Sequence, residues 1–305
     1  METSISPSYT KDSVISKDGT TIGYRQMGHG PGLILLHGGM KSSQDFMKLG
    51  EALSDTFTVY LPDRRGRGLS GPPGDHFSVM REVEDLQSII AKIGASNIFA
   101  LSSGALVALK TALTTPAIEK AALYEPPLSI NGSAPVSWVP RYNSEMTKGK
   151  LAAAAVTAMK GLGTEPVFSK LPRFVLVPLM ALILKLQGES KGDNVTIRSL
   201  IPTQHFDMHI VQEMSDTLED YVSLQIPILL LGGEKSPAFL SLALDGLAAT
   251  LPHAQRKTFP GLGHDGPEDD GRPDLIAEEL RHFFTEPDSI SNRQVNQEKQ
   301  KHRID

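Results

Sequence analysis

The 305-residue sequence contains no cysteine, and this absence excludes a thiolate nucleophile, thiolate metal ligands and disulfide bonds. A strong charge of one sign is also missing, because 30 lysines and arginines stand against 35 aspartates and glutamates, for a net charge of -5. So mild an acidic excess gives no reason to expect nucleic acid or an anionic membrane surface as a partner.

Long hydrophobic segments are missing as well. The most apolar run, FVLVPLMALIL at residues 174–184, is shorter than the roughly 20 residues that cross a bilayer, and Pro178 interrupts it. The N-terminal stretch METSISPSYTKDSV lacks the basic start and apolar core of a signal peptide. We therefore expect no membrane span and a cytoplasmic location.

Apolar strands alternate with helical patterns in two parts of the chain. GLILLHGG, FTVYLPD, NIFAL and KAALYEP are typical of buried strands, and the alternation resumes with IPILLLGG and QRKTFPG. This order favours an α/β fold, with a mostly parallel, doubly wound sheet covered by helices on both faces.

The segment between these two parts is helical in pattern and contains several prolines. We interpret it as an insertion in one sheet and divide the chain into a first core part (1–128), a helical insertion (129–221), a second core part (222–285) and a polar tail (286–305). The tail is polar throughout, so we expect it to be disordered.

The stretch ALSSG places two serines where a predicted strand ends, which is the edge where ligands of such sheets bind. A serine whose Oγ stands clear of the backbone there needs a very tight turn with small neighbours. Centring the turn on Ser102 puts Ala100 and Gly104 at the crowded positions, whereas centring it on Ser103 puts Leu101 there. Ser102 is therefore the predicted nucleophile, and the backbone N–H of Ser103 a predicted oxyanion donor, with its side chain free to vary.

This turn resembles the G-x-S-x-G nucleophile elbow of the α/β-hydrolase superfamily, with Ala100 replacing the first glycine. The stretch LLHGGM resembles the superfamily's oxyanion loop, which implies that the N–H of Gly39, or alternatively of Met40, faces the nucleophile. We expect the His37 side chain to bond loop backbone rather than to do chemistry. PDRRGRGLSG resembles the turn after the next strand, where Asp63 and the arginines are expected to fix loops.

The resemblance also implies a general base, His264, in FPGLGHDGPED after the last predicted strand. A neutral imidazole takes the serine proton and returns it, provided that a carboxylate holds its other nitrogen. At the usual position of that acid, in LLLGGEKSP, this chain has Ser236, which carries no negative charge. The acid is therefore missing or has moved.

A second place for the acid is the end of the preceding strand, where Glu125 is the only acidic residue in AALYEPPL. A carboxylate is costly to bury without a partner, which indicates that it has one. Some haloalkane dehalogenases and the zearalenone-type lactonases keep their acid here, and the lactonases also resemble this chain in a Ser-Ser-Gly elbow. We predict Glu125 as the acid, with three alternatives: Asp207, Glu234 and Asp265.

The insertion matches the place and length of the superfamily's helical lid, so part of its apolar surface is expected to meet a hydrophobic substrate. The possible pocket residues are His37, Trp138, Met146, Phe168, Phe174 and Asp207. HFDMH raises a metal interpretation, but its histidines and Asp207 alternate, and alternate residues of a helix do not share a face. We expect no metal and no cofactor.

These features together predict a lid-bearing serine hydrolase that cleaves an ester, lactone or thioester of a hydrophobic small molecule through an acyl-enzyme. Two alternatives stay open, because one fold hosts many chemistries. The first is a cyclase, isomerase or C–C bond-processing enzyme, and the second is a small-molecule receptor with weak or no hydrolysis. Neither the substrate nor the oligomeric state follows from the sequence.

Overall fold

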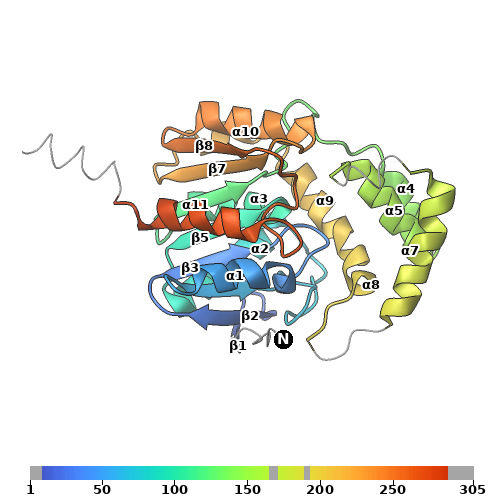
Figure 1. Ribbon diagram of the computed structural model, residues 1–305, viewed down its shortest axis with the longest axis horizontal. Coiled ribbons are helices and arrows are strands. Elements are labelled where there is room, and N and C mark those ends of the chain that lie inside the picture. The colour runs from blue at the N-terminus through green and yellow to red at the C-terminus, as the bar shows by residue number, and fades with distance from the viewer. Residues whose placement is uncertain (1–8, 165–170, 189–192, 288–305) are drawn as a thin grey trace, which may run out of the picture.

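The computed structural model describes residues 9–164, 171–188 and 193–287, which form one sheet with helices on both faces (Figure 1). The strand order of the sheet is β1-β2-β4-β3-β5-β6-β7-β8. β2 runs antiparallel to β1 and β4, and the other neighbouring strands are parallel. The strands are β1 (Thr10–Ile15), β2 (Thr21–Gly28), β3 (Gly32–Leu36), β4 (Thr58–Pro62), β5 (Asn97–Leu101), β6 (Lys120–Tyr124), β7 (Ile228–Gly233) and β8 (Ala254–Phe259).

Two groups of helices cover the two faces of the sheet. On one face, α1 (Met47–Leu53), which follows the short turn η1 (Ser43–Phe46), packs against α11 (Pro273–Thr285). On the other face lie α2 (Val79–Ile93), α3 (Ser103–Thr114) and α10 (Ala238–Thr250). The sheet is therefore buried on both sides, as a mostly parallel sheet requires.

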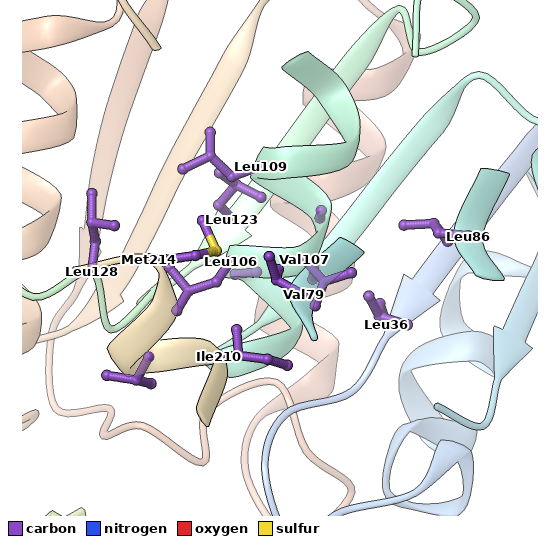
Figure 2. Packing of buried hydrophobic residues seen from close by; sticks show 14 of the residues in the cluster. Leu36, Val79, Leu86, Leu106, Val107, Leu109, Leu123, Leu128, Ile210 and Met214 are labelled. Atoms are coloured by element: carbon purple, nitrogen blue, oxygen red, sulfur yellow. The ribbon is translucent and has the colours of Figure 1, made fainter. Parts of the chain in front are cut away.

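The central strands are continuous apolar runs in the sequence because both of their faces are buried. Successive side chains of a strand point to opposite faces. In β3, Leu33 and Leu35 join the core under α1 and α11, whereas Ile34 and Leu36 join the core on the α3 side. Figure 2 shows the core on the α3 side, in which Leu106 of α3 lies close to the sheet. Both faces of these strands thus bury apolar side chains.

Between β6 and β7 the chain leaves the sheet and runs through a helical insertion. Its elements are α4 (Val139–Thr147), α5 (Leu151–Leu162), α7 (Arg173–Gln187), α8 (Ile197–Leu200), η2 (Ile201–Thr203), α9 (Gln204–Glu213) and η3 (Leu218–Tyr221). Ile210 of α9 and Met214 just after it belong to the same buried cluster as Leu106 of α3 (Figure 2). The insertion is therefore anchored on the helix that begins at the serine turn.

The predicted fold class is confirmed, because the sheet is mostly parallel and covered by helices on both faces. The boundaries assigned to the insertion, 129–221, stay a prediction. Residues 288–305 of the predicted tail, and Phe168, lie outside the described residues. Within the part of the chain that the structure describes, no helix is both long and apolar enough to cross a membrane.

Candidate active site

Ser102 occupies a sharp turn between the end of β5 and the start of α3. Its φ of 55° and ψ of -128° fall in a region that costs a non-glycine residue about 1–3 kcal/mol. The Ser102 N–H donates to the carbonyl of Tyr124 at 2.9 Å, and the Ser102 carbonyl accepts from the Ala105 N–H at 2.8 Å. A Cβ at Gly104 would lie 2.3 Å from the carbonyl oxygen of His37. The turn thus requires the small residues that the sequence supplies.

The loop after β3 passes between this turn and Asp207. A Cβ at Gly38 would lie 3.0 Å from the Cβ of Ser102, and one at Gly39 would lie 3.0 Å from the carboxyl carbon of Asp207. Met40 follows with a φ of 52°, and its N–H donates to Asp207 Oδ2 at 3.4 Å. The glycines let the loop approach both neighbours closely.

The carboxylate of Glu125 and the imidazole of His264 form a hydrogen-bonded pair. Glu125 Oε2 lies 2.6 Å from His264 Nδ1, and its other oxygen accepts the N–H of Gly233 at 2.7 Å. The Glu125 side chain is 1% exposed and that of His264 is 14% exposed. Glu125 follows β6 directly, and its φ of 48° is a second strained position of the site. The structure therefore brings the predicted base and the predicted acid together.

The alternative acids lie elsewhere. Asp207 bonds two arginines, and Glu234 accepts a backbone N–H at 2.8 Å. Asp265 lines the cavity described below, but among the described residues the carboxylate that is hydrogen bonded to the His264 ring is that of Glu125. At the usual acid position, the Ser236 hydroxyl is buried and has no partner among the described residues.

Ser103 and Asp207 belong to a buried charged cluster that the sequence did not reveal. Ser103 Oγ donates to Asp207 Oδ1 at 2.8 Å and accepts from Arg64 Nη1 at 2.9 Å, which corrects the expectation that this side chain is free to vary. Arg64 also bonds Glu82 with two nitrogens, at 2.5 and 2.9 Å. Burial alone raises the pKa of Asp207, but the charges of Arg67 and Arg64 lower it to about 2. Asp207 is therefore ionised.

His37 is fully buried and does not line the cavity described below. Its Nε2 accepts the backbone N–H of Arg64 at 3.1 Å, and its Nδ1 lies 2.9 Å from the carbonyl of Gly38. Burial, together with the charges of Arg67 and Arg64, lowers the pKa of His37 well below its usual value. A neutral His37 with its proton on Nδ1 satisfies both contacts, so its side chain joins two loops. The prediction that His37 is a possible pocket residue is therefore wrong.

A cavity of about 240 Å³ lies beside the serine turn. One side of it includes Ser102, Gly39 and His264. Polar groups border it at Lys41, Gln204, Asp207 and Glu268, and the rest of the wall is mainly apolar, with Met159, Leu162, Met180, Met208, Val211, Phe239 and Leu240. The pair Lys41–Glu268 is hydrogen bonded. The cavity therefore joins the strained serine, a histidine and a largely apolar chamber.

Most of the pocket residues expected from the insertion lie elsewhere. Trp138 is buried against Gly161 and donates to the carbonyl of Pro135, and Met146 packs at the edge of the core. Phe174 is 79% exposed on the outer side of α7, because this helix turns Met180 inward instead. Of the six candidates, Asp207 is the one that lines the cavity; Phe168 is outside the described residues.

The alternating HFDMH residues separate on α9. Asp207 points to the arginines, whereas the His209 ring lies 6.0 Å from the ring of Phe77 and its side chain is 48% exposed. In residues 9–164, 171–188 and 193–287, no group of three or more histidine, aspartate and glutamate side chains is arranged to hold a metal ion. The Asp207 carboxylate is instead committed to two arginines and Ser103.

A mostly parallel eight-stranded sheet with a strained serine turn at the carboxyl end of a central strand defines the class of α/β-hydrolase folds. A family model described as alpha/beta hydrolase fold matches residues 31–270. The chain therefore belongs to this family, and it is an enzyme of the hydrolase type.

Individual relatives agree with this assignment. An alpha/beta hydrolase from Sphaerobacter thermophilus is 31% identical, covers 90% of this chain and 100% of its own, and has a TM-score of 0.71. An esterase, RhEst1 from Rhodococcus sp. ECU1013, is 24% identical over 90% of this chain and 98% of its own, with a TM-score of 0.67. A cis-3-alkyl-4-alkyloxetan-2-one decarboxylase of Shewanella oneidensis is 22% identical over 94% of this chain and 92% of its own length.

Proposed function

We propose that the protein is a serine hydrolase that cleaves an ester, lactone or thioester of a hydrophobic small molecule through an acyl-enzyme. The observation that carries this proposal is the buried Glu125, 2.6 Å from His264, in a site whose cavity is also lined by the strained Ser102. A histidine held by a carboxylate beside a protruding serine is the arrangement that activates a hydroxyl for attack.

The reaction follows from the roles of these three side chains. Ser102 Oγ attacks the carbonyl carbon while His264 Nε2 takes its proton, and Glu125 stabilises the imidazolium through Nδ1. His264 then gives the proton to the leaving oxygen or sulfur, which leaves an acyl group on Ser102. Water attacks this acyl group, again passing a proton to His264, and the acid product departs as Ser102 regains its proton.

Two backbone N–H groups suit the oxyanion formed in each step. The Ser103 N–H is in the first turn of α3, where a helix leaves its N–H groups without intrahelical acceptors. The Gly39 N–H has no acceptor among the described residues, whereas the Met40 N–H is engaged by Asp207. We therefore assign the oxyanion hole to Gly39 and Ser103 and regard Met40 as the lesser choice.

The cavity supports a hydrophobic substrate of small size. Its apolar wall comes largely from the insertion, through Met159, Met180 and Met208, so we assign the insertion the role of a lid over the site. Methionine side chains fill irregular spaces and adapt to ligand shape. The proposed acid position resembles that of zearalenone-type lactonases, and it is compatible with a lactone as well as an open ester. The cytoplasmic location stays a prediction from the N-terminal sequence.

Turnover of p-nitrophenyl esters and of lactones of increasing chain length tests the proposal. We expect the products together to weigh one water more than the substrate, as a single hydroxy acid from a lactone and as an acid plus an alcohol from an ester. We also expect oxygen from labelled water in the acid and no turnover by Ser102→Ala. The similarity to an oxetanone decarboxylase makes the product mass decisive. An unchanged mass, or loss of carbon dioxide, would replace the proposal with an isomerase or a decarboxylase.

A further inference from the structure

Asp207 belongs to the insertion, yet its carboxylate lies at the catalytic end of the cavity, where it is 2% exposed. Oδ1 accepts Ser103 Oγ at 2.8 Å and Arg64 Nη1 at 3.0 Å. Oδ2 accepts Arg67 Nη2 at 2.7 Å and, as the longest of the four bonds, the Met40 N–H at 3.4 Å. One carboxylate of the insertion thus joins three segments of the core.

Two of these segments carry the N–H groups that we assign to the oxyanion hole. Met40 directly follows Gly39, and a Cβ at Gly39 would lie 3.0 Å from the Asp207 carboxyl carbon, so the loop rests on this side chain. Ser103 supplies its N–H to the hole while its Oγ bonds Asp207. A shift of Asp207 would therefore move both donors.

The charge of Asp207 by itself would oppose the reaction, because a carboxylate beside a developing oxyanion repels it. Arg64 and Arg67 prevent this, since the two arginines balance the two carboxylates of Asp207 and Glu82 in the cluster. The cluster is neutral as a whole, and Asp207 can act as a hydrogen-bond acceptor without leaving a net negative field at the site.

The helix that presents Asp207 is firmly docked. Met208, Ile210 and Val211 of α9 are buried, and the Phe206 ring lies 4.7 Å from the ring of Phe77. Glu213, the last residue of α9, accepts the N–H of Val79 at 2.8 Å. α9 is thus fixed to the core at both the Asp207 end and its far end.

We infer that Asp207 is a positioning residue through which the insertion holds the oxyanion loop against the nucleophile turn, so that the oxyanion hole is complete only with α9 docked. This inference rests on the proposed serine hydrolase function. It gives the insertion a part in catalysis besides roofing the cavity.

Asp207→Asn tests the inference, with Asp85→Asn as a matched control. Asp85 also forms a buried pair with an arginine, Arg65, at 2.6 and 2.7 Å, but it lines no part of the cavity. We expect both variants to unfold at lower temperature. With p-nitrophenyl butyrate as substrate, we expect kcat of Asp207→Asn to fall about 10- to 100-fold with little change in KM, because small displacements of oxyanion donors cost that much. Asp85→Asn keeps the wild-type kcat.

A purely electrostatic role of Asp207 predicts the opposite change in kcat. If Asp207 acted only through its charge, its removal would leave Glu82 alone to balance the two arginines, and the resulting net positive charge would raise kcat. An unchanged or raised kcat in folded Asp207→Asn would therefore overturn the inference, and so would an equal loss of kcat in Asp85→Asn. A trifluoromethyl ketone, which forms a tetrahedral oxyanion on the serine, should bind Asp207→Asn at least about tenfold more weakly.

Ser103→Ala keeps the test decisive if Asp207→Asn does not fold. It removes one hydroxyl bond to Asp207 and retains both the cluster's charges and the backbone N–H. We expect about a threefold to tenfold lower kcat at unchanged KM, whereas a wild-type kcat contradicts the inference. Wild-type protein that turns over no ester and binds no ketone would instead remove the proposed function itself.

Discussion

Replacement of Glu125 by glutamine changes the site by a single atom, and the structure fixes its consequence. Glu125 must accept two hydrogen bonds at once, from His264 Nδ1 at 2.6 Å and from the Gly233 N–H at 2.7 Å. A glutamine has one accepting oxygen and one donating nitrogen. Whichever way its amide is turned, one of the two contacts is lost.

The two orientations damage the site differently. If the amide oxygen stays on Gly233, the NH₂ group faces His264 Nδ1 and forces the ring proton onto Nε2, where the ring cannot take the serine proton. If the amide is turned over, two N–H groups oppose each other at Gly233, which costs about 1–3 kcal/mol for a buried donor without an acceptor. The first orientation is cheaper, so the wrong tautomer prevails.

A serine protease with the equivalent acid-to-amide change loses about 10⁴-fold in kcat. We expect Glu125→Gln to lose about 10³- to 10⁴-fold in kcat/KM, which corresponds to about 4–5.5 kcal/mol of transition-state stabilisation. The assay is ester hydrolysis followed through the released p-nitrophenolate, with the melting temperature measured on the same samples.

Glu234→Gln is the matched control, because Glu234 also accepts a backbone N–H, at 2.8 Å, but does not contact His264. It should keep kcat/KM within about twofold of the wild type, as surface changes usually do. Folded Glu125→Gln with more than about a tenth of the wild-type kcat/KM would refute our assignment of the acid.

Three further changes probe the surroundings of the site. Tyr124→Phe removes a hydroxyl that donates to the carbonyl of Gly263, the residue before His264, at 2.7 Å, so we expect kcat to fall about tenfold. The control Tyr142→Phe loses a comparable 2.6 Å bond in the insertion and should lower only the melting temperature. Equal kcat in both variants would show that Tyr124 does not position His264. Gly104→Ala would place its Cβ 2.3 Å from a carbonyl oxygen, and a variant that expressed with wild-type stability would contradict the geometry of the turn. Folding lowers the pKa of Asp207 from its usual value of 3.8 to about 2, which stabilises the folded protein by roughly 2 kcal/mol above pH 4. This stabilisation is lost as the pH falls towards 2. The melting temperatures of the wild type and Asp207→Asn, measured by calorimetry, should therefore converge between pH 4 and pH 2.

Local sterics made the serine turn predictable. The turn depends on residues within a few positions of Ser102, and the sequence shows directly that Ala100 and Gly104 are small. The strands were equally predictable, because burial on both faces leaves a continuous apolar run. That Glu125 has a partner was predictable for a related reason, since one carboxylate in an apolar stretch indicates a buried partner, and Glu125 lies 2.6 Å from His264.

The cavity wall depends on information that the sequence does not hold. Helix α7 is apolar on every side, so nothing in its pattern distinguishes the inward Met180 from Phe174, which is 79% exposed. The contacts of Asp207 join positions up to 167 residues apart, and from the sequence a turn rich in arginines predicts only a loop. Such contacts arise from how the insertion docks, and a helical pattern alone does not specify docking.

The covalent adduct formed with a fluorophosphonate is the most direct test of Ser102 as the nucleophile. We predict one adduct per chain in the intact mass, mapped to Ser102 by peptide sequencing, absent in Ser102→Ala and retained in Ser103→Ala. Folded wild-type protein that gains no adduct, or carries it on another residue, would contradict the account.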